Sequence, residues 1–276
     1  MSWNWRGMGA IMRKDLRQVV QNKMIWLPMI IVPAMFTVIL PSVLILLPSM
    51  LSPAEFESES NDLAGLFRAM PEEFKRPLQE LTPVQSWVML SANYLFAPMF
   101  LIVPLMVSSI LGADSFAGEK ERKTLEGLLY TPLSDTELIV AKLLVALIPA
   151  LVIDIASFLV YGLAVNLAGY KAMGRLFFPV ATWWPLVFWV APAISLAGLG
   201  ATVLISSKAK GFMEAQQLSG ALLLPSVFMM IGQVSGLFFL SVGLLVIIGL
   251  FVGIIGAWLI WIGAKTFARG EIIARI

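Results

Sequence analysis

Long uncharged runs alternate with short charged segments along the chain. Four of these runs cover residues 24–51, 86–113, 143–170 and 176–207, interrupted only by Asp154. A membrane-spanning helix needs about 20 apolar residues, so each run is long enough for one crossing. We therefore expect four spans here.

A fifth uncharged run, residues 215–264, is too long for a single crossing. As one helix it would extend about 75 Å, whereas the hydrocarbon core of a bilayer is about 30 Å thick. It is expected to cross twice and to turn near residues 232–236. The pattern predicts an all-α integral membrane protein with six transmembrane helices, forming a single domain over residues 1–276.

Composition and charge support this interpretation and orient the chain. Hydrophobic residues make up 59% of the sequence and charged residues 13%, against about 25% charged in soluble proteins. Fourteen of the 19 Lys and Arg residues fall on the side of both termini, which the positive-inside rule places in the cytoplasm. Residues 114–136 and 206–217 are then cytoplasmic loops, and residues 52–85 an extracytoplasmic loop. The net charge of +2 is a topology signal and implies no nucleic-acid partner.

The segment before the first span, residues 1–23, has helical periodicity. Trp5, Met8, Met12, Leu16 and Val19 are expected on one face, with Arg6, Arg13 and Arg17 on the other. This pattern predicts an amphipathic helix lying along the inner leaflet. Either it anchors the chain to the lipid bilayer through anionic lipid, or it contacts a cytoplasmic partner.

The sequence lacks the usual catalytic groups. It contains no His and no Cys, which excludes Cys/His zinc sites, thiol catalysis and His-based triads. No phosphate-binding loop occurs, because the nearest fragment, "AGEK", lacks both the leading glycine and the Ser or Thr after the lysine. The fifteen Met residues are scattered and suit flexible core packing. The chain is thus expected to be no enzyme and to bind no metal or cofactor itself.

The loop "DSFAGEKERKTLEGLLYTPLSDTE", residues 114–137, concentrates charge between two apolar runs. Glu119 lies four residues before Lys123, and Leu125, Leu128 and Leu129 form an apolar strip, so a short amphipathic helix is expected. "TP" ends it, and "SDTE" supplies a capping box that begins the third span. The loop is either a solvated connector or a surface that docks into a partner's groove.

This region resembles the signature of bacterial ABC type-2 exporter permeases, the group that includes sodium-export and drug- or peptide-resistance permeases. The positions that match the family pattern are Glu119, Glu121, Arg122, Thr124, Leu125, Glu126, Leu128, Leu129, Thr131, Pro132, Ser134 and Lys142. The later "SSKAKGFMEAQQLSGALLLP" resembles the second cytoplasmic loop of the family. Lys123 departs from the pattern, which has a glycine there, and the loop 52–85 matches no family-wide pattern.

The resemblance implies a transmembrane permease in a bacterial or archaeal cell membrane that exports a substrate. Its coupling helix would seat in a cytoplasmic ABC ATPase subunit that binds ATP and Mg²⁺, with two ATPase copies and a second permease copy, identical or paralogous, in the complex. It assigns the coupling contact to Glu119, Glu121, Arg122, Thr124, Leu125, Glu126 and Leu128, and a second contact to Lys208, Lys210 and Glu214. Sodium, a hydrophobic drug, a peptide and a lipid all fit as substrate.

Asp154 is the one acid inside a predicted span, and a charge at membrane depth is typical of a functional site. It is expected either in the transport pathway or in a polar contact, for instance with Ser157. Small residues at Ala193, Ala197 and Ala201 and in "GLFVG" are expected to allow close helix packing. The alternative function is a stand-alone secondary transporter or channel, which would normally show more charges at membrane depth or internal repeats. A lipid-modifying enzyme would need clustered acids or a nucleophile and base.

Overall fold

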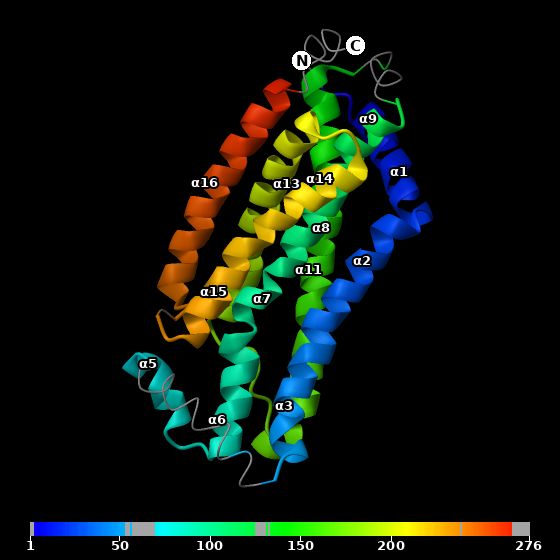
Figure 1. Ribbon diagram of the computed structural model, residues 1–276. Coiled ribbons are helices and arrows are strands. Elements are labelled where there is room, and N and C mark those ends of the chain that lie inside the picture. The colour runs from blue at the N-terminus through cyan, green and yellow to red at the C-terminus, as the bar shows by residue number, and fades with distance from the viewer. Residues whose placement is uncertain are drawn as a thin grey trace.

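Six helices long and apolar enough to cross a membrane form a bundle in the computed structural model (Figure 1). They run Lys23–Met50, Pro83–Glu121, Asp135–Met173, Trp183–Lys208, Phe212–Val234 and Val242–Thr266. The structure describes residues 3–52, 56, 70–124, 131, 133–237 and 239–266. The predicted all-α membrane fold and the number of spans are confirmed, including the two crossings of the fifth uncharged run.

Most spans are assembled from several helical pieces. The first comprises α2 (Lys23–Ala34), η1 (Met35–Ile39) and α3 (Leu40–Met50); the second α6 (Pro83–Leu90), η3 (Ser91–Leu95), α7 (Ala97–Phe100), α8 (Ile102–Ala113), η4 (Asp114–Gly118) and α9 (Glu119–Glu121). The third is α11 (Asp135–Met173); the fourth α12 (Trp183–Pro185), η5 (Leu186–Val190) and α13 (Ala191–Lys208); the fifth α14 (Phe212–Ser219), η6 (Gly220–Leu223) and α15 (Leu224–Val234); the sixth α16 (Val242–Thr266).

Proline explains several of the irregular turns. Pro41 lies two residues after the π-helical turn η1, and Pro192 two residues after the π-helical turn η5. Proline has no N–H to donate to the carbonyl four residues back, so the ladder is broken locally and rearranges.

The second span is the centre of the bundle, because 83% of its most apolar window is buried, against 17% for the sixth span. Polar groups in its core are satisfied by neighbouring spans: Tyr161 Oη donates to the carbonyl of Ala92 at 2.5 Å, and Trp183 Nε1 donates to the carbonyl of Asn93 at 3.0 Å. Such bonds are needed where no water reaches the backbone.

α16 lies at the outside of the bundle and packs closely on α13 (Figure 1). A methyl group added at Gly256 would lie 2.7 Å from the amide nitrogen of Ala197, and one at Gly253 would lie 3.6 Å from Cβ of Ala193. Only a glycine allows the first of these approaches, so the prediction that small residues bring these spans together is confirmed.

At the end opposite α1 (Trp5–Gln21), two short helices precede the second span. They are α5 (Glu72–Lys75) and the 3₁₀ turn η2 (Arg76–Leu78). Phe74 and Leu78 are buried against Tyr94 and Phe239, so this part of the predicted loop 52–85 is packed on the bundle. Most of residues 53–69 lie outside the described part of the chain.

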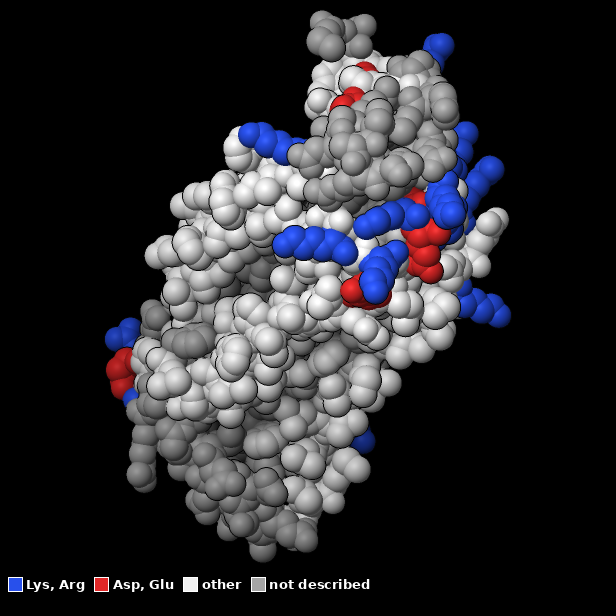
Figure 2. Space-filling model, turned by 45° about the horizontal axis from the view of Figure 1, so that its top comes forward, with Lys and Arg blue, Asp and Glu red and all other residues white. Residues whose placement is uncertain are grey.

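α1, α9 and the start of α11 share one end of the bundle, called the charged end below (Figure 1). Lys and Arg side chains gather around it, whereas the middle of the flank in view is uncharged (Figure 2). Here one expectation is corrected. The second span does not stop before the charged loop but continues through η4 and α9 to Glu121, so the first charges of the loop lie on the span itself.

Candidate functional site

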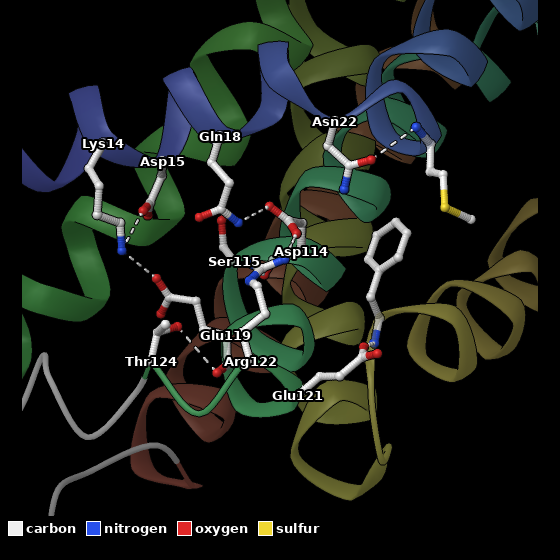
Figure 3. Close-up of polar contacts among 12 residues, drawn as sticks. Lys14, Asp15, Gln18, Asn22, Asp114, Ser115, Glu119, Glu121, Arg122 and Thr124 are labelled. Carbon is white, nitrogen blue, oxygen red and sulfur yellow. Dashed lines mark hydrogen bonds and ion pairs between the residues drawn. The ribbon is translucent and has the colours of Figure 1, made fainter.

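The charged end holds a network of buried ionic groups, and Figure 3 shows the part formed by α1, η4 and α9. Its members come from the N-terminal helix α1, from the end of the second span, from the start of the third span and from the connection between α13 and α14. These elements are far apart in the sequence, and the network joins them. It is therefore the candidate functional site at this end of the molecule.

Glu119 is the central group. Its carboxylate accepts a hydrogen bond from Lys14 Nζ at 2.8 Å and a second from Lys142 Nζ, and Lys142 Nζ also donates to the carbonyl of Ser115 at 2.7 Å. Glu119 is 1% exposed and Lys142 is 2% exposed. A buried charge is tolerated only when it is paired and hydrogen-bonded, and both conditions are met here. The Glu119 carboxylate thus ties α1 and α11 to the second span.

Asp114 and Arg122 form a second pair, one turn nearer the bundle centre. Arg122 Nη1 lies 2.9 Å from Asp114 Oδ1, Nη2 donates to the Asp114 carbonyl at 3.3 Å, and the Gln18 amide of α1 lies between the two side chains. Gly118 leaves space for the Asp114–Arg122 pair, because a methyl group there would lie 2.8 Å from Asp114 Oδ1 and 3.0 Å from Arg122 Nη2.

The helix ends with a left-handed residue at Lys123, whose φ is 55°. The amide of Thr124 donates to the carbonyl of Glu119 at 3.0 Å, and the amide of Lys123 donates to that of Lys120 at 3.2 Å. These two bonds define a Schellman motif, in which glycine is the usual left-handed residue because it has no Cβ. The left-handed conformation therefore explains why the resembled family pattern has glycine at this position. Lys123 adopts the same turn at a cost in conformational energy.

This turn also corrects the predicted helix. The i, i+4 pairing of Glu119 with Lys123 requires an uninterrupted helix, whereas α9 ends at Glu121. Leu125, Glu126, Leu128 and Leu129 lie outside the described residues, as does the remainder of the expected amphipathic strip.

Two further side chains fasten the connection between α13 and α14. Glu121 Oε2 accepts the backbone N–H of Phe212 at 2.8 Å, and Lys120 Nζ donates to the carbonyl of Ala209 at 2.9 Å. Phe212 is the first residue of α14, so the Glu121 carboxylate lies where the unpaired amides and positive dipole end of that helix favour an anion. The two predicted cytoplasmic loops are therefore in direct contact.

The third span begins with the predicted capping box. The side chain of Ser134 accepts the amide of Glu137, and the Glu137 carboxylate accepts the amide of Ser134 at 2.8 Å. The same carboxylate also accepts the amide of Asn4 at 2.7 Å, so the start of α1 is attached to the start of α11. The predicted box is confirmed, and it has a second, long-range role.

The two ionisable groups that α1 contributes are both perturbed. For Lys14, partial burial acts to lower the pKa, but the hydrogen bond that Lys14 donates to Glu119 and the negative charge of Glu119 outweigh this, so the pKa is raised above its usual range. Burial raises the pKa of Asp15, and the charges of Lys142 and Lys14 only partly oppose this. Asp15 is 4% exposed and its Oδ1 lies 3.0 Å from Lys14 Nζ.

The residues singled out from the sequence thus fall into separate groups. Glu121, Arg122 and Thr124 are exposed at the charged end. The prediction that Glu119 is a docking residue is corrected: its carboxylate is buried and pairs with Lys14 and Lys142 of the same chain, so it is an internal anchor. Lys208, Lys210 and Glu214 are exposed on and beside the α13–α14 connection, where the amide of Lys210 donates to Glu214 at 2.7 Å.

Asp154 lies apart from this network, about halfway along α11. It is 1% exposed, and its Oδ1 has no hydrogen-bond partner among the described residues, so the expected contact with Ser157 is not made by that oxygen. Across the described part of the chain, no three acidic side chains come together as a metal site.

Sequence reasoning missed Lys14, Asp15, Gln18 and Asp114 as members of the network. One signal was available in the sequence of α1: Asp15 lies on the same helix face as the apolar residues Met8 and Val19. An acid that is buried with such residues needs a buried partner.

Comparison with known proteins adds the family. A family model described as ABC-2 family transporter protein matches residues 9–255, which is nearly the whole chain. The matched range includes Lys14, Glu119 and Lys142 of the network. No curated protein matches the chain significantly. No solved structure does so either.

Proposed function

Because the chain belongs to the ABC-2 transporter family, we propose that it is the permease subunit of an ATP-driven exporter whose ATP is hydrolysed by a separate cytoplasmic ATPase. Its six spans make it a multi-pass membrane protein, and the family match supports the permease component of an ABC transporter. The excess of Lys and Arg at the charged end supports a cytoplasmic position for that end, in the cell membrane of a bacterium or archaeon.

The observation that carries the proposal is the attachment of the Glu119–Thr124 segment to three other parts of the bundle. Glu119 holds α1 and α11, and Glu121 holds α14. A displacement applied to the outside of this segment therefore reaches α1 and the third and fifth spans directly. A flexible connector would dissipate the same movement in the loop.

The surface available to the ATPase lies on the outer side of the network. Lys123, Thr124, Lys208 and Lys210 are exposed there, and Glu214 lies beside them. Leu125, Glu126 and Leu128 are expected to extend this surface, and complementary charge on the ATPase would fix its register. Two ATPase subunits that share ATP and Mg²⁺ need two such surfaces, so a second permease copy, identical or paralogous, completes the complex.

The test is co-expression with an ABC ATPase subunit from the same organism. We expect the two proteins to co-purify, and ATP hydrolysis in proteoliposomes to depend on both. The double variant Lys123→Glu/Lys210→Glu, which leaves the internal pairs intact, should lose the ATPase while still inserting in the membrane.

Lys75→Glu at the opposite end is the control. Because the pair that Lys75 forms with Glu72 is exposed and lies at the end opposite the network, this reversal should leave ATPase binding unchanged. Transport that persists without any ATPase would instead establish a secondary transporter, and retention of the ATPase by the double variant at the wild-type level would refute the proposed surface.

A further inference from the structure

The outer face of α1 carries an open groove that the charge network does not use. It is lined by Gly9, Met12, Arg13, Leu16, Arg17, Val20 and Gln21 and has a volume of about 660 Å³. A methyl group at Gly9 would meet no atom within 4 Å, so the groove is open at that point. Its lining combines apolar side chains with two guanidinium groups.

The opposite face of α1 is fully occupied by the bundle. Its buried residues are Met8, Ile11, Asp15 and Val19. This corrects the predicted apolar face, because Trp5 is 68% exposed and Leu16 is 37% exposed, both on the outer side. The helix is therefore apolar on two sides, and the outer apolar side is left without a partner in the described chain.

The two arginines of the groove are also uncommitted. Arg13 and Arg17 are exposed, and neither makes a hydrogen bond or ion pair with any described residue. They stand four residues apart on the helix and so project from the same side. Two guanidinium groups in this arrangement suit a phosphate, which they bind through paired hydrogen bonds and charge.

The position of the groove selects a lipid as the occupant. Exposed apolar residues also follow α1: Val20 at its end is 72% exposed, and Met24 and Ile31 in the first span are 61% and 52% exposed. The exposed apolar face of a membrane-spanning helix lies against acyl chains. The groove therefore lies where that hydrocarbon surface meets the headgroups.

We propose that this groove is a binding site for an anionic phospholipid. The phosphate lies between Arg13 and Arg17, and an acyl chain lies along Leu16 and Val20 toward the first span. The same turns of α1 present Lys14 and Gln18 inward to Glu119 and Asp114, so a bound headgroup stabilises the helix that holds the network. This second consequence rests on the proposed function, whereas the binding itself does not.

The experiment uses the absence of cysteine from the chain. Gly9→Cys introduces a single thiol in the groove, which is labelled with an environment-sensitive fluorophore in the detergent-solubilised full chain. Phosphatidylglycerol is then titrated in mixed micelles, with phosphatidylcholine as the neutral lipid and inorganic phosphate as the free anion. We expect a saturable signal with phosphatidylglycerol alone.

Arg13→Gln/Arg17→Gln should weaken the phosphatidylglycerol response at least tenfold, since each basic residue at a membrane surface contributes about fivefold. Lys171→Gln/Arg175→Gln, at the end opposite α1, is the matched control and should leave it unchanged. Equal responses to both phospholipids, or an unchanged affinity in the double arginine variant with native circular dichroism, would overturn the proposal.

Adding the ATPase distinguishes the remaining possibility. If the ATPase, and not phosphatidylglycerol, shields the label at Gly9→Cys, the groove is a protein contact and the lipid site is wrong. If phosphatidylglycerol fails to bind while the ATPase still co-purifies, the lipid site falls and the proposed function stands.

Discussion

Replacing Lys142 with Met is the sharpest test of the network at the charged end. The Lys142 side chain is 2% exposed and pairs with Glu119, also 2% exposed at its side chain, so the substitution removes the enclosed partner of an enclosed carboxylate. Breaking a buried pair from one side typically costs 3–5 kcal/mol, and Glu119 keeps only the half-exposed Lys14 as its paired cation. We expect Lys142→Met to lower the free energy of unfolding by about that amount.

Lys14→Met provides the internal comparison, since it removes the other cation on the same carboxylate. The Lys14 side chain is 46% exposed, so solvent screens its pair and the expected loss is about 1 kcal/mol or less. The double variant Glu119→Gln/Lys142→Met removes both buried charges. It should recover most of the stability lost in Lys142→Met alone, because no unpaired charge remains.

The assay is denaturant unfolding of the detergent-solubilised chain followed by tryptophan fluorescence, for which the nine Trp residues provide the signal. With the single variant Glu119→Gln included, the stability differences form a double-mutant cycle that reports the coupling between Glu119 and Lys142. If Lys142→Met and Lys14→Met cost the same within about 1 kcal/mol, burial does not set the strength of these pairs and the argument fails.

Three further changes test other features. Lys123→Gly should raise the free energy of unfolding by about 1 kcal/mol, since glycine adopts the left-handed turn without steric cost; a loss of stability in the same unfolding assay would contradict the Schellman motif. Gly118→Ala should destabilise by about 1–3 kcal/mol, as its methyl group forces the Asp114–Arg122 pair apart, and the loss should nearly vanish in an Arg122→Ala background. Asp154→Asn should alter transport by the reconstituted complex while co-purification of the ATPase is unchanged, and a wild-type transport rate would remove Asp154 from the pathway.

The spans and the capping box followed from the sequence because both depend on local patterns. An uncharged run of 28 residues has one low-cost location, the bilayer core, whatever its neighbours are. Likewise, Ser134 and Glu137 satisfy backbone groups three residues away. These are the features for which short windows contain the whole of the physical cause.

The role of Glu119 did not follow, because its partners are distant in the chain. Lys14 lies 105 residues before it and Lys142 lies 23 residues after it. The amphipathic pattern predicted that Glu119 pairs with Lys123, its neighbour on an ideal helix. That pattern does not show the left-handed turn at Lys123, which ends the helix. Similarly, the apolar face of α1 was misplaced because both of its sides carry apolar residues, and only packing shows which side is inside.

The pairing of Glu119 with Lys142 also bears on how the chain enters the membrane. These residues belong to consecutive spans, so the acid at the end of the second span meets its counter-ion as soon as the third span is made. α1 is synthesised first, yet the groups that receive Lys14, Gln18 and the amide of Asn4 lie on the second and third spans. The N-terminal helix therefore cannot complete its contacts until Glu137 has been synthesised, so its docking follows the synthesis of the second span.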